Sequence, residues 1–206
     1  MRAEQTGNGA HGSVLVLACG ALARELVRIR ELNGWEHVRV QCLPAALHNT
    51  PEAIPDAVEA TLDRLQDAFD HVFVAYADCG TGGRLDRLLA GRGIARLPGA
   101  HCYEFLAGSE VFDELAQAEP GSFYLTDFLV RHFDRLVVQG LGLDRFPQLR
   151  ERYFGHYRQV VYFAQTRDAE LQQKARAQAQ RLGLGYRYRY CGDAPLSGAL
   201  RPVLEG

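Results

Sequence analysis

In the first half of the chain, short apolar runs alternate with segments in which apolar residues recur every three or four positions. The run SVLVLACG is almost entirely apolar, as expected of a strand that is buried on both faces. In the segments with apolar residues every three or four positions, these residues would lie on one side of a helix. The pattern predicts strands at residues 13–20, 37–45, 71–80 and 94–99, and helices at residues 21–32, 55–69 and 82–93.

The second half is expected to contain more helix and fewer strands. Residues 109–143 suggest two helices around the Pro120-Gly121 break, with Thr126 or Asp127 as the cap of the second. The remaining pattern predicts a helix at 147–157, a strand at 158–166, a helix at 168–182 that Gly183 ends, and a strand at 186–192 with one packed face.

Alternating strands and helices predict an α/β fold. We expect a mainly parallel, Rossmann-like sheet with helices on both faces and a more helical second half. Residues 13–206 are predicted to form a single α/β domain, because no segment has the composition of a linker, and residues 1–12 a disordered leader. Ligands of such sheets bind beyond the carboxyl ends of the strands.

Charge and hydropathy narrow the possible functions. The 206 residues include 23 basic and 25 acidic side chains, a net charge of -2, which argues against a nucleic-acid partner. No apolar stretch approaches the roughly 20 residues that cross a bilayer, and the first dozen residues lack the apolar region of a secretory signal. We therefore predict a cytoplasmic protein that acts on a small molecule and has no membrane partner.

A cysteine followed by a glycine ends three of the predicted strands, at Cys19, Cys79 and Cys191. The five cysteines are an odd number and no export signal accompanies them, so we expect reduced thiols rather than disulfides. Neighbouring strands lie about 4.8 Å apart, which brings thiols at their ends within reach of one metal ion. Each following glycine permits a positive φ and a close approach of the turn to a bound group.

Two loops place further metal-binding side chains at the same edge: LPAALHNTPE contains His48, and PGAHCYEFLAG contains Cys102. We predict a metal site formed by Cys19, His48, Cys79 and Cys102, with His101 and Cys191 as reserve ligands. Mixed thiolate and imidazole ligands favour zinc, and an iron-sulfur cluster is the alternative. Buried thiols that only fill space are the competing interpretation, which we apply to Cys42.

The turn after the third strand has a second interpretation, because glycine-rich turns before a helix expose backbone N–H groups to anions. Gly80, Thr81, Gly82 and Gly83 are the candidate residues for such a cofactor or anion pocket, although the turn lacks the Lys-Ser/Thr ending of a P-loop.

Two carboxylates are candidate catalytic residues. Glu104 is a candidate general base beside a metal-bound water, and otherwise orients His101 or caps a turn. Asp78 is a candidate hydrogen-bond partner of a ligating histidine, and otherwise caps the following helix.

Longer segments carry a resemblance to a known family: LACGALARE, LPAALHNTPE, YADCGTGG, HCYEFLAG and FYLTDFLVRHFD, followed by LGLDRFPQL and YFAQT. From about residue 14 to residue 192, the chain resembles the family known as domain of unknown function 1638. The resemblance implies a link to corrinoid-dependent methyltransferase systems of bacteria and archaea, and so a corrinoid protein or a methyltransferase as partner. The family pattern matches at Cys19, His48, Cys79 and Cys102.

Two functional hypotheses follow. The first is a zinc-dependent enzyme or accessory protein in methyl or one-carbon transfer, with its Cys/His site at the carboxyl ends of the strands. The alternative is a non-catalytic module that binds an iron-sulfur cluster, a corrinoid or a small anionic ligand. The aromatic segment FYLTDFLVRHFD is expected to lie mainly in the core, where it can also wall a pocket.

Overall fold

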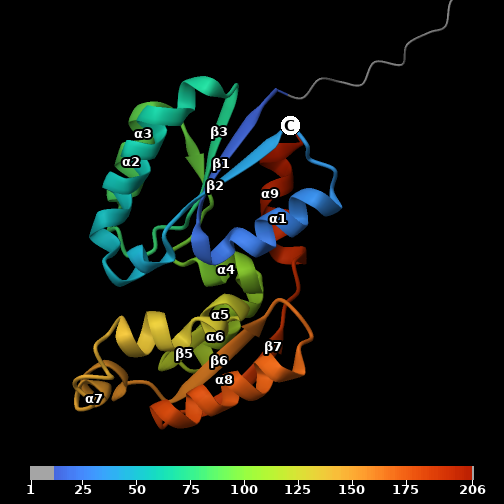
Figure 1. The fold of residues 1–206 in the computed structure, drawn as a ribbon. Coiled ribbons are helices and arrows are strands. Elements are labelled where there is room, and N and C mark those ends of the chain that lie inside the picture. The colour runs from blue at the N-terminus through green and yellow to red at the C-terminus, as the bar shows by residue number, and fades with distance from the viewer. Residues whose placement is uncertain (1–11, 206) are drawn as a thin grey trace, which may run out of the picture.

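The computed structural model of the protein describes residues 12–205, so residues 1–11 of the predicted leader lie outside the described residues. Four parallel strands form the first sheet, in the order β2-β1-β3-β4 (Figure 1). These strands are β1 (Val14–Cys19), β2 (Val38–Leu43), β3 (His71–Ala75) and β4 (Ala95–Arg96). All four fall within the ranges predicted from the hydrophobic pattern.

Helices cover both faces of this first sheet (Figure 1). Buried side chains of β1 and β3, such as Leu17 and Val74, pack with α2 and α3, while Val16 and Phe73 face the opposite way and pack with α1, α4 and α9. The helices of this half are α1 (Ala23–Leu32), α2 (Ile54–Leu65), α3 (Arg84–Arg92) and α9 (Ala194–Leu204), with short 3-10 helices η1 (Gly20–Leu22), η2 (Ala45–Asn49), η3 (Pro51–Ala53) and η4 (Gln66–Ala68).

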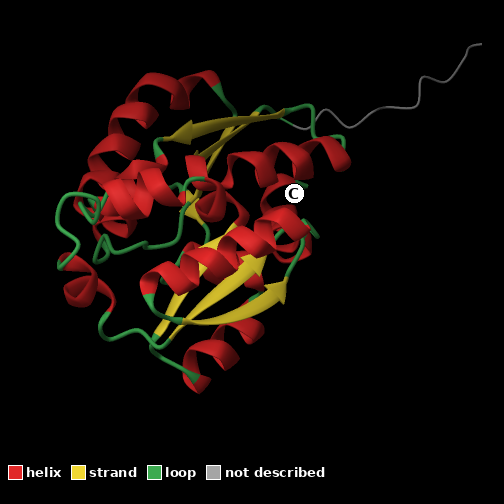
Figure 2. Ribbon diagram, turned by 60° about the horizontal axis from the view of Figure 1, so that its bottom comes forward, coloured by secondary structure: helices red, strands yellow, loops and turns green. Residues whose placement is uncertain are grey.

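A second parallel sheet contains three strands in the order β5-β6-β7 (Figure 2). Its strands are β5 (Ser122–Thr126), β6 (Gln159–Ala164) and β7 (Gly185–Tyr190). Residues from α6, α7 and α8 pack on one face, and residues from α4 and α5 pack on the other. The helices are α4 (Cys102–Ala107), α5 (Ser109–Ala118), α6 (Asp127–Arg131), a π-helix η5 (Asp134–Gln139), α7 (Leu149–Phe154) and α8 (Ala169–Leu182).

Helix ends follow the local chemistry of the sequence. Asp168 accepts hydrogen bonds from the backbone N–H groups of Glu170 and Leu171 at the start of α8, and Gly183 ends this helix in the left-handed conformation. Thr126 caps α6 by accepting a hydrogen bond from the N–H group of Leu129. The predicted bounds of α8 and the capping role of Thr126 are confirmed.

The α/β class, with parallel sheets and helices on both faces, is confirmed, but the strands are divided between two sheets. Strand β5 lies where the pattern had suggested only helices around a break, and α4 and α9 were not predicted. The run 122–126 becomes a strand because it pairs with β6, from Ser122 opposite Gln159 to Thr126 opposite Phe163. This pairing joins segments about 37 residues apart, which no local pattern encodes.

The two halves meet at the carboxyl ends of their strands. After β7 the chain returns to the first half as α9, where the carboxylate of Asp193 pairs with the guanidinium of Arg28 on α1. The side chain of Asn49 donates a hydrogen bond to the carbonyl oxygen of Leu136 at 3.2 Å. Residues that follow strands of both sheets therefore face one shared space.

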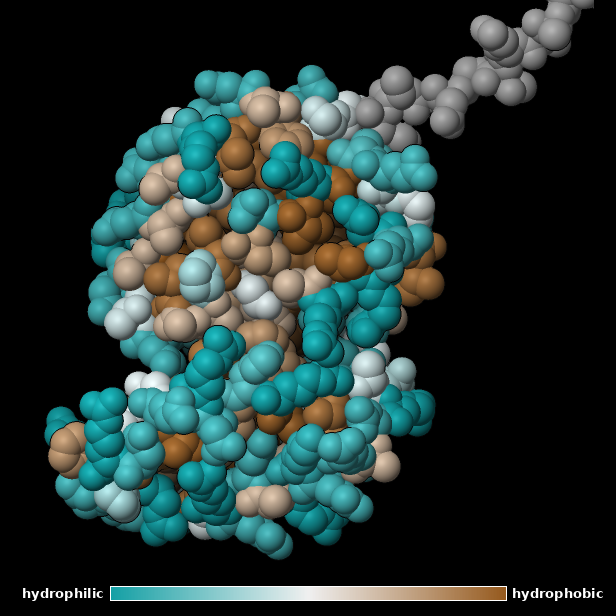
Figure 3. Space-filling model, viewed as in Figure 1, coloured by the Kyte–Doolittle hydropathy of each residue, from teal (hydrophilic) through white to brown (hydrophobic). Residues whose placement is uncertain are grey.

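The surface differs between the two halves. Figure 3 shows mostly hydrophilic side chains over the half with the second sheet, whereas apolar side chains are visible between the helices of the first half. None of the helices between residues 12 and 205 combines the length and apolarity needed to cross a membrane.

Candidate metal centre

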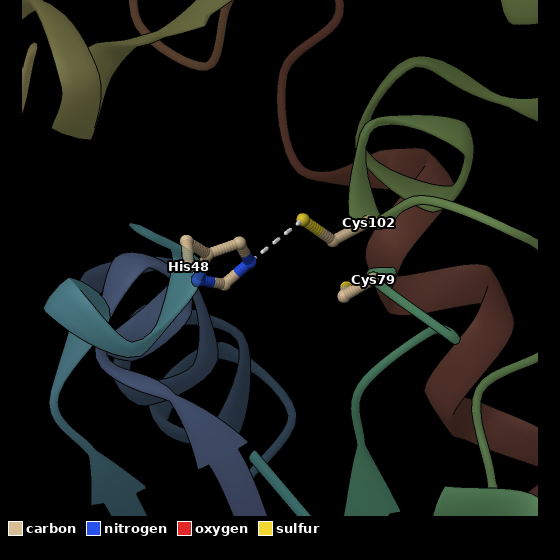
Figure 4. Close-up of side chains that lie close together, drawn as sticks. All are labelled: His48, Cys79 and Cys102. Carbon is tan, nitrogen blue, oxygen red and sulfur yellow. Dashed lines mark hydrogen bonds between the residues drawn. The ribbon is translucent and has the colours of Figure 1, made fainter. Parts of the chain in front are cut away.

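Three of the four predicted metal ligands meet at the carboxyl end of the first sheet. His48 lies in η2 after β2, Cys79 lies in the loop after β3, and Cys102 is the first residue of α4. One ligand atom from each side chain lies within 4.8 Å of the others (Figure 4). The strands thus bring together residues that are up to 54 positions apart in the sequence.

The spacing of these donor atoms suits a tetrahedral metal ion. Bond lengths of about 2.3 Å to sulfur and 2.0–2.1 Å to nitrogen place neighbouring ligand atoms about 3.5–3.8 Å apart. The Sγ atom of Cys102 lies 3.9 Å from the Nε2 atom of His48. Two thiols and one imidazole can therefore bind one zinc ion with small movements of the side chains, leaving a coordination position free for another ligand.

Cys79 has an unusual backbone conformation for a residue with a side chain. Its φ angle is 50°, and no other non-glycine residue in the described range has a positive φ. The N–H group of Cys79 donates to the carbonyl oxygen of Ala100, and that of Asp78 donates to Gly99. The left-handed conformation costs about 1–2 kcal/mol for such a residue. Strain of this kind is concentrated at functional sites, which supports a role for this thiol.

Cys19, the fourth predicted ligand, lies outside the group of three but contacts it. Its Sγ atom is 3.4 Å from the Nδ1 atom of His48, and it also accepts a hydrogen bond from the N–H group of Ala21. With Nε2 directed toward Cys102, this contact fixes the orientation of the imidazole. Gly20 lets the chain approach β2 closely, because a Cβ atom there would lie 2.8 Å from the carbonyl oxygen of Leu43. The close approach of the chain to β2, rather than a positive φ angle, explains why a glycine stands at position 20.

The three central side chains differ in protonation in the metal-free site. The neighbouring Cys102 thiol and the His48 imidazole lower the pKa of Cys79 to about 5. Burial alone would lower the pKa of His48, but the neighbouring sulfurs of Cys19 and Cys79 outweigh it and raise this pKa to about 10. The same contact with Cys79, together with burial, raises the pKa of Cys102. At neutral pH the metal-free site therefore holds one thiolate, and binding of a metal releases protons.

Tyr76 belongs to the site although the sequence analysis did not single it out. Its ring is buried and stacks on the imidazole of His48, with ring centroids 6.4 Å apart and an angle of 16° between the planes. Burial and the sulfur of Cys19 raise the pKa of its hydroxyl, which stays neutral. Its position three residues before Cys79, at the end of an apolar run, is the only sequence signal for it.

The glycine-rich turn is stabilised by a side chain of the protein itself. The carboxylate of Asp78 accepts hydrogen bonds from the hydroxyl of Thr81 and from the N–H groups of Gly82 and Gly83. These contacts lower the pKa of Asp78. Asp78 therefore stabilises the turn before α3 and does not cap the helix itself, which has no side-chain cap hydrogen bond. An anion would have to compete with Asp78 for the N–H groups of the turn. Gly80 has a positive φ of 88°.

Three other candidates take positions beside or away from the centre. Glu104 folds over Gly99, where an added Cβ atom would lie 2.2 Å from its carboxylate oxygen. His101 is exposed at the start of α4. Cys191 follows β7 of the second sheet, and burial raises its pKa to about 11. Cys42 lies in β2 and packs against the core, in line with the role assigned to it.

A cavity of about 270 Å³ opens beside His48 and Cys102. Residues from both halves line it, including Ala21 and Leu22 after β1 and Phe123, Thr126 and Phe128 in and after β5. The aromatic segment at 123–134 thus contributes to a pocket wall as well as to the core.

Comparison with known proteins gives one match. The sequence model of a family described as "Protein of unknown function (DUF1638)" matches residues 42–194. This range contains His48, Cys79 and Cys102, and it begins after Cys19. No curated protein and no solved structure matches the chain.

Proposed function

The chain belongs to the DUF1638 family, and we propose that it binds one zinc ion through His48, Cys79 and Cys102 and uses it in catalysis. The convergence of these three side chains within 4.8 Å carries the proposal. Catalytic zinc sites use three protein ligands and keep a fourth position open for water or substrate. The cavity beside His48 and Cys102 provides the space for such a substrate.

We propose methyl or one-carbon transfer to a small thiol as the reaction. A bound zinc ion lowers the pKa of a coordinating thiol, so that the thiolate, which is the nucleophile, forms at neutral pH. The thiol proton passes to solvent, the sulfur forms a bond to the methyl carbon, and the bond from that carbon to the donor breaks with its electron pair on the donor. The link to corrinoid-dependent methyltransferase systems that the family resemblance implies supports a methylated corrinoid, carried by a partner protein or methyltransferase, as the donor.

The chain's own residues prepare the site for this role. Cys19 and Tyr76 orient the imidazole of His48, and the turn that Asp78 stabilises presents Cys79 in its strained conformation. Five unpaired thiols fit a reducing compartment, which supports the cytoplasm as the location.

Metal analysis of protein purified anaerobically without chelators tests the proposal. We expect about one zinc ion per chain in the wild type and in Cys42→Ser, and almost none in Cys79→Ser or Cys102→Ser. Cys42 is the matched control because it is also a partly buried cysteine of the first sheet. A folded wild type without bound metal, or a Cys79→Ser variant with full zinc, would contradict the proposal. Bound iron with visible absorption would favour the iron-sulfur alternative instead.

A further inference from the structure

The cavity beside the metal centre is apolar over most of its wall. Its lining in the described part of the chain contains no Asp, Glu, Lys or Arg side chain. Leu129, Leu136, Val137 and Leu141 form much of the wall contributed by the second half. Away from His48 and Cys102, a charged group placed here would lose its hydration without gaining a partner of opposite charge, which is strongly unfavourable.

Two polar side chains of the wall away from the centre, Thr126 and Asn49, already have partners. The hydroxyl of Thr126 accepts the hydrogen bond that caps α6, and the amide of Asn49 donates to the carbonyl oxygen of Leu136. The metal-binding atoms of His48 and Cys102 lie 3.9 Å apart in the same wall, so the cavity offers a metal at a single place. A ligand that fits this distribution has one polar, metal-binding end and an apolar remainder.

The volume limits the size of that ligand. The cavity of about 270 Å³ lies near the lower end of the roughly 300–1,000 Å³ of pockets that bury drug-sized ligands, and an apolar cavity of about 150 Å³ is enough to hold benzene. A single small ring with a short side chain therefore fits this space.

We infer that the cavity binds the uncharged apolar tail of a small thiol whose sulfur reaches the metal centre. This inference rests on the proposed function, because the metal supplies the attraction for the sulfur. Thiolates are preferred ligands of zinc, and the apolar wall selects against thiols with an ionised tail. The tail contacts both halves of the molecule, because the wall contains Ala21 and Ala45 of the first half and Phe128 and Leu129 of the second.

Cobalt-substituted protein provides a direct binding assay, because thiolate coordination changes the visible spectrum of Co²⁺. We propose titrations with phenylmethanethiol, with 2-mercaptoethanesulfonate as the thiol with a charged tail, and with phenylmethanol as the same tail without sulfur. Phenylmethanethiol is expected to bind at least about tenfold more tightly than either of the other probes. Equal affinities for the two thiols would overturn the inference.

Two variants test whether the cavity is the cause of this preference. Leu129→Trp fills the space and should weaken phenylmethanethiol binding by about tenfold or more, whereas Val27→Trp adds the same ring at an exposed position of α1 and should have no effect. Phe128→Arg introduces a positive charge at the wall and should shift the preference toward 2-mercaptoethanesulfonate, a gain of binding that misfolding cannot produce.

The outcomes separate this inference from the proposed function. A wild-type protein that binds neither zinc nor cobalt overturns both. A protein that binds metal in a manner dependent on Cys79, but whose thiol affinities do not respond to Leu129→Trp or Phe128→Arg, overturns only the assignment of the cavity.

Discussion

The Nδ1 atom of His48 lies 3.4 Å from the Sγ atom of Cys19, a buried cysteine at the end of β1. The other ring nitrogen, Nε2, faces Cys102 at 3.9 Å. One imidazole therefore has two different sulfur neighbours, one on each nitrogen. Because metal-ligating histidines are usually oriented by a partner of the second nitrogen, this geometry makes Cys19 a positioning residue and Cys102 a ligand.

Replacement of Cys19 by Ala should therefore weaken zinc binding without abolishing it. Loss of a group that orients a ligand typically reduces metal affinity about 10–100-fold. Competition titrations with a chromophoric chelator would measure this change, with Cys42→Ala as the control that keeps wild-type affinity. If Cys19→Ala loses zinc as completely as Cys79→Ser, then Cys19 is a direct ligand and the three-residue site is wrong.

Because the backbone at Cys79 is left-handed, we expect glycine to be more stable than alanine at this position, the reverse of the usual order within a strand. In metal-free protein, Cys79→Gly should be more stable than Cys79→Ala by about 1 kcal/mol, because glycine adopts φ of 50° without strain. Urea unfolding of the two variants measures the difference.

The same pair of substitutions at Cys42 gives the control. This residue lies within β2, where glycine is less stable than alanine by about 0.5–1 kcal/mol. If glycine were less stable than alanine at both positions, the conformation of Cys79 would not be strained in solution.

Removal of the metal should destabilise the protein. A ligand that binds only the folded state stabilises it by about 2.7 kcal/mol at a free concentration 100 times its Kd. Thermal unfolding of zinc-loaded wild type should therefore shift to lower temperature when a strong chelator is added. Cys79→Ser should unfold at the same temperature with and without chelator, and an equal shift in this variant would mean that the chelator acts elsewhere.

The fully buried carboxylate of Asp127 predicts a large loss of stability on truncation. It accepts hydrogen bonds from the hydroxyl groups of Tyr162 and Thr166 and from the N–H group of Gln165. Asp127→Ala leaves these donors without a partner and should lower the free energy of unfolding by roughly 3–5 kcal/mol. Urea unfolding measures the loss.

The exposed carboxylate of Asp134 provides the comparison. It pairs with Arg181 at the surface, and Asp134→Ala should cost less than about 1 kcal/mol. Similar losses for Asp127→Ala and Asp134→Ala would show that the buried network contributes little to stability.

The pH dependence of stability should depend on Glu25. This side chain of α1 is 4% exposed, and one of its carboxylate oxygens has no hydrogen-bond partner in the described structure. Burial raises its pKa, despite the neighbouring charge of Arg28, and the carboxylates of Asp127 and Asp193 act in the same direction as burial. The folded state therefore retains a proton that the unfolded state releases above its ordinary pKa of 4.5.

Stability consequently falls as pH rises from that ordinary value through the raised one. Glu25→Gln removes this contribution. The free energy of unfolding of the variant, relative to that of the wild type, should therefore be higher at pH 8 than at pH 5. Thermal unfolding at both values measures the gain, and Glu31→Gln, at an exposed position of the same helix, should show none. Parallel curves for wild type and Glu25→Gln would contradict the prediction.

Local pattern was sufficient for much of the fold. Apolar runs predicted β1, β3 and β6, and the helical spacing with Asp168 and Gly183 at its ends predicted α8. Strand β5 was missed because its short apolar run, Phe123 to Leu125, has no periodicity that separates a strand from a buried helix. Its identity is decided by pairing with β6, a partner that lies far away in the sequence.

The candidate site shows the same division. The sequence by itself determined which residues can bind a soft metal and that Cys19, His48, Cys79 and Cys102 follow or end segments of a parallel sheet. It could not separate Cys191 from them, because an identical Cys-Gly step ends β7, and only strand pairing places that strand in a second sheet. The tertiary structure also decided that Cys19 contacts Nδ1 of His48 and that an apolar cavity opens beside the centre. The contact of Cys19 depends on the pairing of β1 with β2, and the cavity depends on how the two sheets pack end to end. Both are set by contacts between distant residues rather than by the residues next to each ligand.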